Sequence, residues 1–200
     1  HTPRPVQAAY TVEQEVVMWF LITLLVLAAI VAFVVAIYNR IITLENRFEN
    51  AWSQIDVQLK RRADLVPNLV ETVKGYASHE KGVFEEVARS RQAMMNAQTP
   101  DEGAEAANMM SQALGRLFAI SEAYPELKAN ENFQLLQEEL SAVENKIAYA
   151  RQFYNDAVLQ YNNAIETVPG VFLAAPMGKK EHVFLEIAEG DRETPQVSFA

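Results

Sequence analysis

The chain has 200 residues, no cysteine and a net charge of −9 at neutral pH. Without cysteine it forms neither disulfides nor thiolate-dependent catalytic or metal sites. Residues 101–200 carry sixteen acidic and seven basic side chains, which argues against a nucleic-acid surface or a broad polybasic contact with anionic lipid. Glycine and proline are sparse, and this composition favours long helices.

The most distinctive stretch runs from Met18 to Ile37, twenty residues without a charged side chain. At about 1.5 Å per residue a helix of this length spans ~30 Å, the thickness of the hydrocarbon core of a bilayer. A cleaved signal peptide would carry its positive charges before the apolar run, whereas Glu13 and Glu15 precede it and Arg40 follows. A buried core helix of a soluble protein is the alternative, although such helices are usually shorter and have a polar edge. We predict a single-pass transmembrane helix over residues 18–37 that contacts the lipid bilayer.

The flanks of this helix give its expected start and orientation. Residues 1–17 are predicted to be a loose tail and the first turns of the helix, because Thr11 and Gln14 fit a capping pair that places the start near Val12. Before the span only Arg4 is basic, whereas five basic residues lie within about 25 residues after it: Arg40, Arg47, Lys60, Arg61 and Arg62. By the positive-inside rule, we expect a protein of the cell (inner) membrane whose soluble part is cytoplasmic.

Residues 38–167 are predicted to form an elongated antiparallel bundle of long helices, so that the fold is all-α. After the span, apolar residues recur every three or four positions through Ala77, which predicts that the membrane helix continues outward as a rigid stalk. Pro67 lies inside this stretch and is expected to kink it near Ala63. The stripe resumes at residues 83–94.

Two further helices are expected. The run Thr99–Glu102 predicts a helix start, with a capping hydroxyl, a proline in the first turn and two early carboxylates. This second helix is predicted to bury a stripe from Ala107 to Ser121 and to end or bend at Tyr124-Pro125. A third helix is expected to carry a heptad seam over residues 133–165, typical of a coiled coil, that lies along the first helix.

Residues 168–200 are predicted to be an extended C-terminal tail that begins where Val168-Pro169-Gly170 ends the third helix. The tail contains an apolar patch at residues 171–177 and the stretch His182–Ile187. That stretch fits a short strand or an extended segment that lies on the bundle or on another subunit. The same two alternatives apply to three aromatic residues of the tail: Phe172, Phe184 and Phe199.

The sequence predicts no catalytic, cofactor-binding or metal-binding residue. His79-Glu80 begins the string HEKGV, but a zinc-protease helix needs a second histidine where Val83 stands. There is no phosphate-binding glycine loop and no serine in a nucleophile elbow. A hydrolase that uses Glu80 or Asp64 has little support, because a general acid or base needs a cleft and a perturbing neighbour. Two further histidines lie in expected loops: His1 and His182.

Two long strings identify a family. Residues 55–80, IDVQLKRRADLVPNLVETVKGYASHE, closely resemble the signature of the LemA family of bacterial membrane proteins. Residues 124–162, YPELKANENFQLLQEELSAVENKIAYARQFYNDAVLQYN, match as well, and the resemblance extends from Tyr38 to about Phe184. It implies one N-terminal anchor, a helical bundle and no catalytic residues. Members are often considered alongside membrane-protease and stress-response partners.

Some relatives look like lipoproteins, with a cysteine at the end of the apolar stretch, where this chain has Ala36-Ile37-Tyr38-Asn39. Relatives of that kind would place their bundle outside the cytoplasm, against the orientation predicted above.

The sequence thus favours a membrane-anchored, non-catalytic scaffold or self-assembling subunit, that is, a homo-oligomer without cofactors or nucleic-acid partners. Its span carries small residues four positions apart, which allow close helix packing: Ala28, Ala32 and Ala36. The tail from Val171 to Ile187 is expected to lie across a neighbouring copy. The alternative is an adaptor that docks on another membrane protein, such as a membrane protease or a stress-response factor, through Lys60–Asn68.

Overall fold

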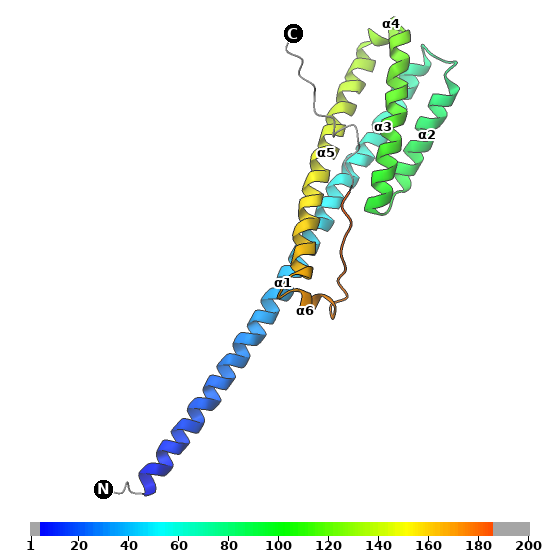
Figure 1. Cartoon of the computed structure of the whole chain (residues 1–200). Helices are drawn as coiled ribbons and strands as arrows, with labels where there is room; N and C mark the ends of the chain where they lie inside the picture. The colour runs from blue at the N-terminus through cyan, green and yellow to red at the C-terminus, as the bar shows by residue number, and fades with distance from the viewer. Residues whose placement is uncertain (1–4, 186–200) are drawn as a thin grey trace, which may run out of the picture. The chain divides into compact units, whose positions relative to one another are not determined.

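The computed structural model describes the backbone of residues 5–185 and the side chains of residues 14–185. Every regular element in this part of the chain is an α-helix, which confirms the predicted all-α fold (Figure 1). The helices are α1 (Pro5–Lys74), α2 (Lys81–Asn96), α3 (Pro100–Ala123), α4 (Pro125–Lys128), α5 (Glu131–Glu166) and α6 (Val171–Ala174).

Helix α1 is continuous over 70 residues, so the apolar span and the segment that follows it are one helix, as predicted. The helix already begins at Pro5, and the predicted start near Val12 is therefore wrong. Proline suits a first helical turn, because its missing N–H has no intrahelical partner there. The side chain of Thr11 and residues 1–4 lie outside the described part.

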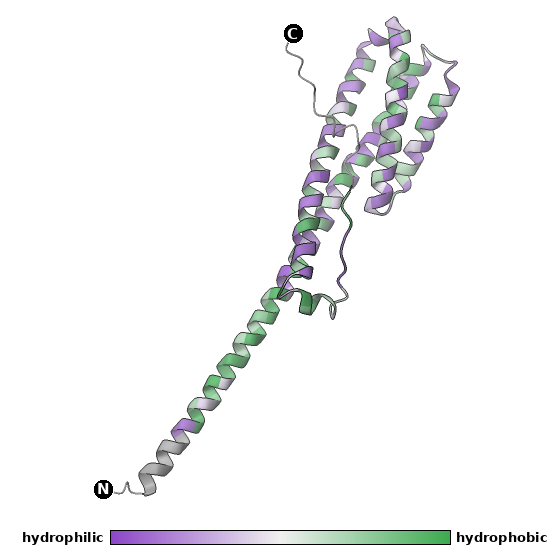
Figure 2. Cartoon of the chain, viewed as in Figure 1, coloured by the Kyte–Doolittle hydropathy of each residue, from purple (hydrophilic) through white to green (hydrophobic). Residues whose placement is uncertain are grey.

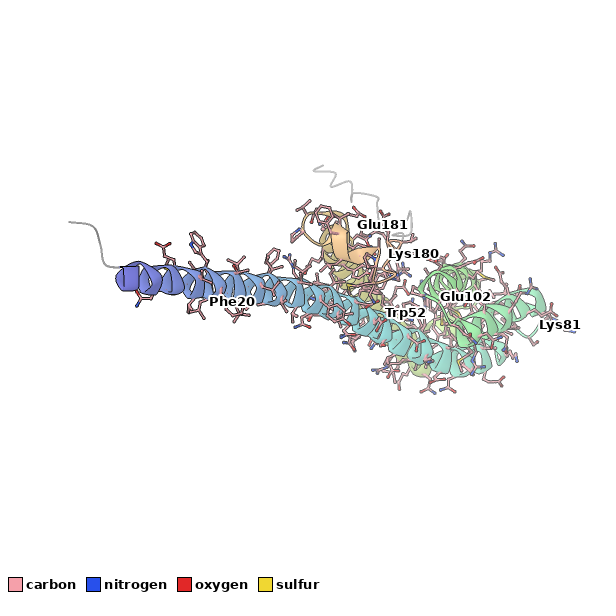
Figure 3. All side chains as sticks on the ribbon, turned by 90° about the horizontal axis from the view of Figure 1, so that it is seen from below. Phe20, Trp52, Lys81, Glu102, Lys180 and Glu181 are labelled. Carbon is pink, nitrogen blue, oxygen red and sulfur yellow. The ribbon has the colours of Figure 1, made fainter. Side chains whose placement is uncertain are left out.

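The N-terminal half of α1 is long and apolar enough to cross a membrane (Figure 2). None of its most apolar stretch is buried inside the chain, whereas a core helix of a soluble protein would be mostly buried. Side chains such as Phe20 project outward from the helix (Figure 3). The one hydroxyl of the predicted span is satisfied locally, since Thr23 Oγ1 donates to the carbonyl oxygen of Trp19 at 2.8 Å.

The first compact unit comprises residues 1–43 and 162–181. Helix α5 ends in it at Glu166, and the chain turns tightly at Gly170, where a Cβ would lie only 1.8 Å from the carbonyl oxygen of Ala164. The short helix α6 follows, so the predicted extended tail begins with a helical turn. Among the described side chains of this unit, the buried apolar ones are Ile41, Ile165 and Ala174.

The second compact unit comprises residues 44–161 and 182–200, and α1 and α5 run antiparallel in it. As the residue number on α1 rises from 47 to 62, that of its partner on α5 falls from 160 to 144. The ring of Phe48 lies 6.4 Å from that of Tyr154 and 5.0 Å from that of Tyr161, each edge-on. The segment after the span is therefore a core helix of the bundle and not a free stalk. The predicted α5 seam is buried at Phe133, Leu140, Val143, Ile147, Tyr154, Ala157, Tyr161 and Ile165.

The prediction of three long helices is wrong in one place. Helix α1 ends at Lys74, residues 75–80 form turns, and α2 is a separate helix that packs on α3. Ala77 is buried within these turns, which explains why the apolar spacing continued across the break.

Pro67 lies inside α1 and has no N–H to donate to the carbonyl oxygen of Ala63. Arg91 of α2 replaces this bond, because its Nε donates to that oxygen at 2.8 Å. Ala63 is fully buried, so its carbonyl would otherwise lack a partner. The contact explains why an arginine stands among the apolar positions of residues 83–94.

Helix α3 begins as predicted. The Thr99 hydroxyl accepts from the Glu102 N–H and the Glu102 carboxylate accepts from the Thr99 N–H, which completes a capping box. Gly103 lies against α1, where a Cβ would come within 2.3 Å of the ring of Trp52. Close approach of α3 to α1 thus depends on this glycine. The predicted stripe of α3 is buried at Ala107, Met110, Leu114, Leu117 and Ser121.

Candidate functional site

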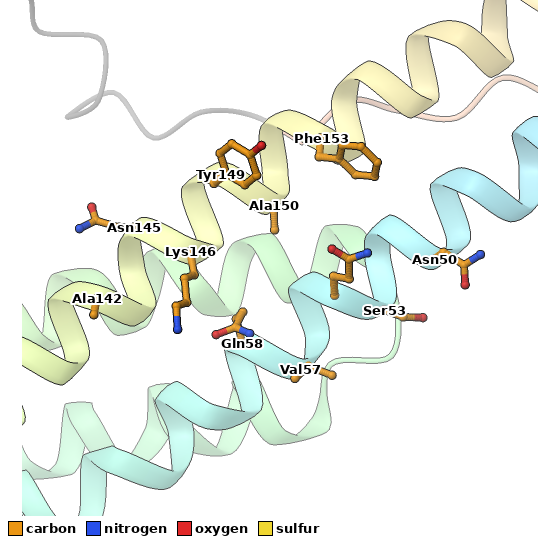
Figure 4. A pocket seen from close by; sticks show the side chains of 11 residues that line it. Asn50, Ser53, Val57, Gln58, Ala142, Asn145, Lys146, Tyr149, Ala150 and Phe153 are labelled. Atoms are coloured by element: carbon orange, nitrogen blue, oxygen red, sulfur yellow. The ribbon is translucent and has the colours of Figure 1, made fainter.

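An open groove of about 1050 Å³ lies between α1 and α5 in the bundle (Figure 4). Helices α2 and α3 lie behind this helix pair, so the groove faces away from them. Eleven residues line it: Asn50, Ser53, Gln54, Val57, Gln58, Ala142, Asn145, Lys146, Tyr149, Ala150 and Phe153.

The groove exists because small side chains line its floor and large ones its rims. Ala142 and Ala150 leave space between the helices, whereas Tyr149 is 76% exposed and Val57 is 59% exposed at the rims. Phe153 is held in place by Arg47, whose guanidinium carbon lies 5.6 Å from the ring centre. Such an apolar and aromatic surface is typical of sites that contact another macromolecule.

The chemistry of the groove is neutral to weakly basic. Lys146 is the only charged residue that lines it, and no carboxylate does, although the chain carries a net charge of −9. Four of the lining side chains are amides that both donate and accept hydrogen bonds. The buried Oε1 of Gln58 has no hydrogen-bond partner within the described chain, so the groove contains an acceptor that an incoming donor would satisfy.

An ion pair between a buried arginine and a partly exposed glutamate lies elsewhere in the bundle. Arg62 of α1 contacts Glu144 of α5 at 2.6 Å and donates to Ser111 Oγ of α3 at 3.1 Å. Burial lowers the pKa of Arg62, the charge of Glu144 opposes this shift, and the nearby Arg151 adds to it. Arginine remains charged at neutral pH despite this shift, so the pair joins three helices in one register.

The chain after α6 is attached to the bundle by a side-chain amide. Asn155 Nδ2 donates to the carbonyl oxygen of Leu185, and the N–H of Leu185 donates to Asn155 Oδ1, both at 2.9 Å. Leu185 is buried, and the ring of His182 lies 4.3 Å from that of Phe48. Of the two alternatives for this stretch, residues 182–185 therefore dock on the bundle of their own chain. Ile187 and Phe199 lie outside the described residues.

Comparison with known proteins agrees with this architecture. The sequence matches the profile of the LemA family over residues 51–199. The chain belongs to the LemA family. It is 27% identical over 205 aligned positions to the magnetosome protein MamQ of Magnetospirillum gryphiswaldense, with 88% of this chain and 75% of the relative covered. MamQ 2 of Paramagnetospirillum magneticum gives the same identity and coverage. Protein LemA of Metamycoplasma hominis is 25% identical over 130 positions, which cover 64% of this chain and 59% of that protein.

The two strings that resemble the LemA family form one structural unit. Residues 55–80 supply Arg62, the Ala63 carbonyl and the Val57 rim of the groove, and residues 124–162 supply Glu144 and the opposite rim. The ion pair was not predicted, because two charged residues on separate helices carry no periodic signal. The groove was missed for the same reason, although a tyrosine one position off the seam of α5 was a usable hint.

The predicted docking stretch Lys60–Asn68 does not form a single surface, because its residues lie on all sides of α1. Arg61, Asp64 and Asn68 are exposed, and the Lys60 ammonium pairs with Asp56 at 2.6 Å. Its remaining buried members belong to the core: Arg62, Ala63 and Val66.

The residues considered for chemistry lie outside the groove. Asp64 is exposed on α1, His79 is exposed in the turns before α2, and Glu80 ends those turns. Within residues 14–185 no group of three or more His, Cys, Asp or Glu side chains is arranged to hold a metal ion. The LemA and MamQ relatives and the helical fold are consistent with a membrane-associated, non-catalytic protein.

Proposed function

We propose that this LemA-family protein is a single-pass, non-catalytic scaffold that assembles with copies of itself at the cell membrane. The observation that supports this most is the groove between α1 and α5, which a second bundle would cover. Helix α1 supports it further, because the predicted span and one wall of the groove belong to the same helix.

The local charge of the groove permits a second copy as the occupant. Two chains of net charge −9 repel each other, and salt only partly screens this repulsion. The groove lowers that repulsion locally, because no carboxylate lines it and Lys146 adds a positive charge. Tyr149 and Val57 offer apolar area to a neighbour, and the amides around them offer hydrogen bonds.

The span supplies a second place for contact between copies. Ala28, Ala32 and Ala36 repeat every four residues and are exposed along α1. Transmembrane helices approach closely where such small residues face each other. We propose that this face aligns neighbouring chains in the bilayer while the groove joins their bundles. The basic flank after Ile37 supports a cytoplasmic position for the bundles, by the positive-inside rule.

The orientation has its own test in intact cells. Because the chain has no cysteine, a single Glu85→Cys variant carries one thiol at an exposed position of α2. A membrane-impermeant thiol reagent should label it only after lysis. Labelling of intact cells would place the bundle outside the cytoplasm.

The alternative function, an adaptor, uses the same groove, which would accept an amphipathic helix of another membrane protein. A photo-crosslinking amino acid in place of Tyr149 separates the two proposals in living cells. The matched control is Leu159, a second exposed apolar residue of α5 that does not line the groove.

Self-assembly predicts an adduct of twice the chain mass from position 149 and little from position 159. An adduct with a different protein would support the adaptor. Equal adducts from both positions, or none from either, would refute the groove as the contact site.

A further inference from the structure

The first compact unit exposes an apolar turn that its own core does not use. Val168 is 73% exposed and Phe172 is 71% exposed, and Val171 between them is partly exposed as well. An isolated exposed apolar residue is ordinary, but three within five positions form a patch that indicates a partner. The patch points outward while its neighbour Ala174 is buried.

The turn has a defined conformation. The N–H of Val171 donates to the carbonyl of Thr167 at 3.0 Å, and the N–H of Leu173 donates to the carbonyl of Gly170 at 2.9 Å. Gly170 fits only because it lacks a side chain, and Gly178 closes the turn with a φ of +68°. The apolar side chains are thus presented from a fixed backbone.

The turn belongs to the same compact unit as the apolar half of α1. Figures 1 and 2 show the apolar α6 at the end of the apolar run of α1, where Ile41 becomes buried. The apolar turn therefore lies at the end of the apolar run of α1, at the level where the bilayer would end.

Charged residues follow the patch directly. Lys179 and Lys180 come after the turn at Gly178, and Lys180 is exposed (Figure 3). Apolar and aromatic residues beside lysines are the composition of segments that lie in the boundary between lipid headgroups and acyl chains. Lysine stems extend along the apolar region while their ammonium groups reach the lipid phosphates.

We propose that residues 168–177 insert into the headgroup region of the bilayer that α1 crosses, with Lys180 directed to lipid phosphates. This inference rests on the proposed membrane span, and it adds a second membrane contact about 130 residues after the first in sequence. The C-terminal end of α5 is then attached to the membrane as well as α1.

The test uses the full chain in vesicles of phosphatidylcholine and phosphatidylserine, with single cysteines that carry an environment-sensitive fluorophore. Ala175→Cys reports on the turn and leaves Val168 and Phe172 intact, and Asn163→Cys is an exposed control in the same unit. Val26→Cys reports on the span. Each label is exposed in turn to lipids with a quencher near the headgroup, lipids with a quencher near the chain end, and aqueous iodide.

The label at position 175 should lose most of its fluorescence with the headgroup quencher and little with iodide. The label at position 163 should lose most of its fluorescence with iodide and little with the headgroup quencher. A Val168→Ser, Phe172→Ser variant should make the Ala175 label accessible to iodide, while its helical circular dichroism stays unchanged. Quenching of the Val26 label by the deep quencher shows that the span is inserted.

If Val26 is inserted but Ala175 behaves like Asn163, the proposed lipid contact is wrong and the membrane anchor stands. Protection of Ala175 from iodide without quenching by either lipid would mean that a second copy covers the turn, which also overturns the proposal. Iodide access to Val26 would refute the anchor itself, and the second contact with it.

Discussion

Replacing Arg91 with alanine should destabilise the bundle through the carbonyl oxygen of Ala63. Arg91 Nε donates to that oxygen at 2.8 Å, and Pro67 prevents the helix from supplying its own donor. Leaving a buried acceptor unpaired costs about 1–3 kcal/mol, and a bond from a charged donor lies in the upper half of that range. We expect a loss of roughly 2 kcal/mol, or about 4–8 °C in the melting temperature of a chain of this size.

A second substitution isolates this bond from the packing of the arginine stem. Pro67→Ala restores an N–H that can donate to the Ala63 oxygen. In that background the loss of unfolding free energy caused by Arg91→Ala should be smaller by at least about 1 kcal/mol. The assay is thermal unfolding of the detergent-solubilised chain followed by circular dichroism, with exposed Arg89→Ala as the control on the same helix. An equal cost of Arg91→Ala in both backgrounds, or a cost no larger than that of Arg89→Ala, would refute the reasoning.

Three further predictions use the same unfolding assay or amide exchange. Gly103→Ala should be destabilising, because a Cβ at this position meets the ring of Trp52. The control is Gly115→Ala, whose Cβ meets nothing within 4 Å and which should raise the free energy of unfolding by up to about 1 kcal/mol. Equal effects of the two substitutions would contradict the close approach of α3 to α1. Leu140→Ala should cost roughly 2–5 kcal/mol, since Leu140 is 3% exposed, and exposed Glu138→Ala should cost almost nothing. Hydrogen bonds from backbone N–H groups lower the pKa of Glu102 in the folded chain. The stabilisation that the Glu102 carboxylate provides is therefore fully present above the pKa that Glu102 has in the unfolded chain, and it is lost as the pH falls through the lowered pKa of the folded chain. Amide exchange in the first turn of α3 should therefore accelerate on acidification, and Glu102→Gln should remove this pH dependence.

Much of the fold follows from local signals in the sequence. The three-and-four spacing of apolar residues predicts the buried faces of α3 and α5, because a helix returns to the same face at that spacing. The run Thr99–Glu102 predicts a helix start, because its side chains satisfy backbone groups only a few residues away. Such features need no knowledge of which helices pack together.

Features that depend on the pairing of helices could not be predicted. Arg62 and Glu144 each look like surface charges in sequence, and only the antiparallel pairing of α1 with α5 brings them to 2.6 Å. Arg91 acquires its role from a proline on another helix. The groove depends on which face α2 and α3 leave uncovered, and the off-seam position of Tyr149 indicates only that its side chain is exposed. The break after Lys74 was hidden because Ala77 continues the apolar spacing in a turn.

Self-assembly is the central claim, and the native mass of the particle extracted from membranes in mild detergent tests it most directly. The groove between α1 and α5 predicts that the parent chain runs at two or more times the chain mass. A Tyr149→Arg variant should run at a lower mass, because it places a second positive charge beside Lys146 at the contact, whereas Leu159→Arg should match the parent. A parent chain that runs as a monomer, with both variants unchanged, would contradict the scaffold.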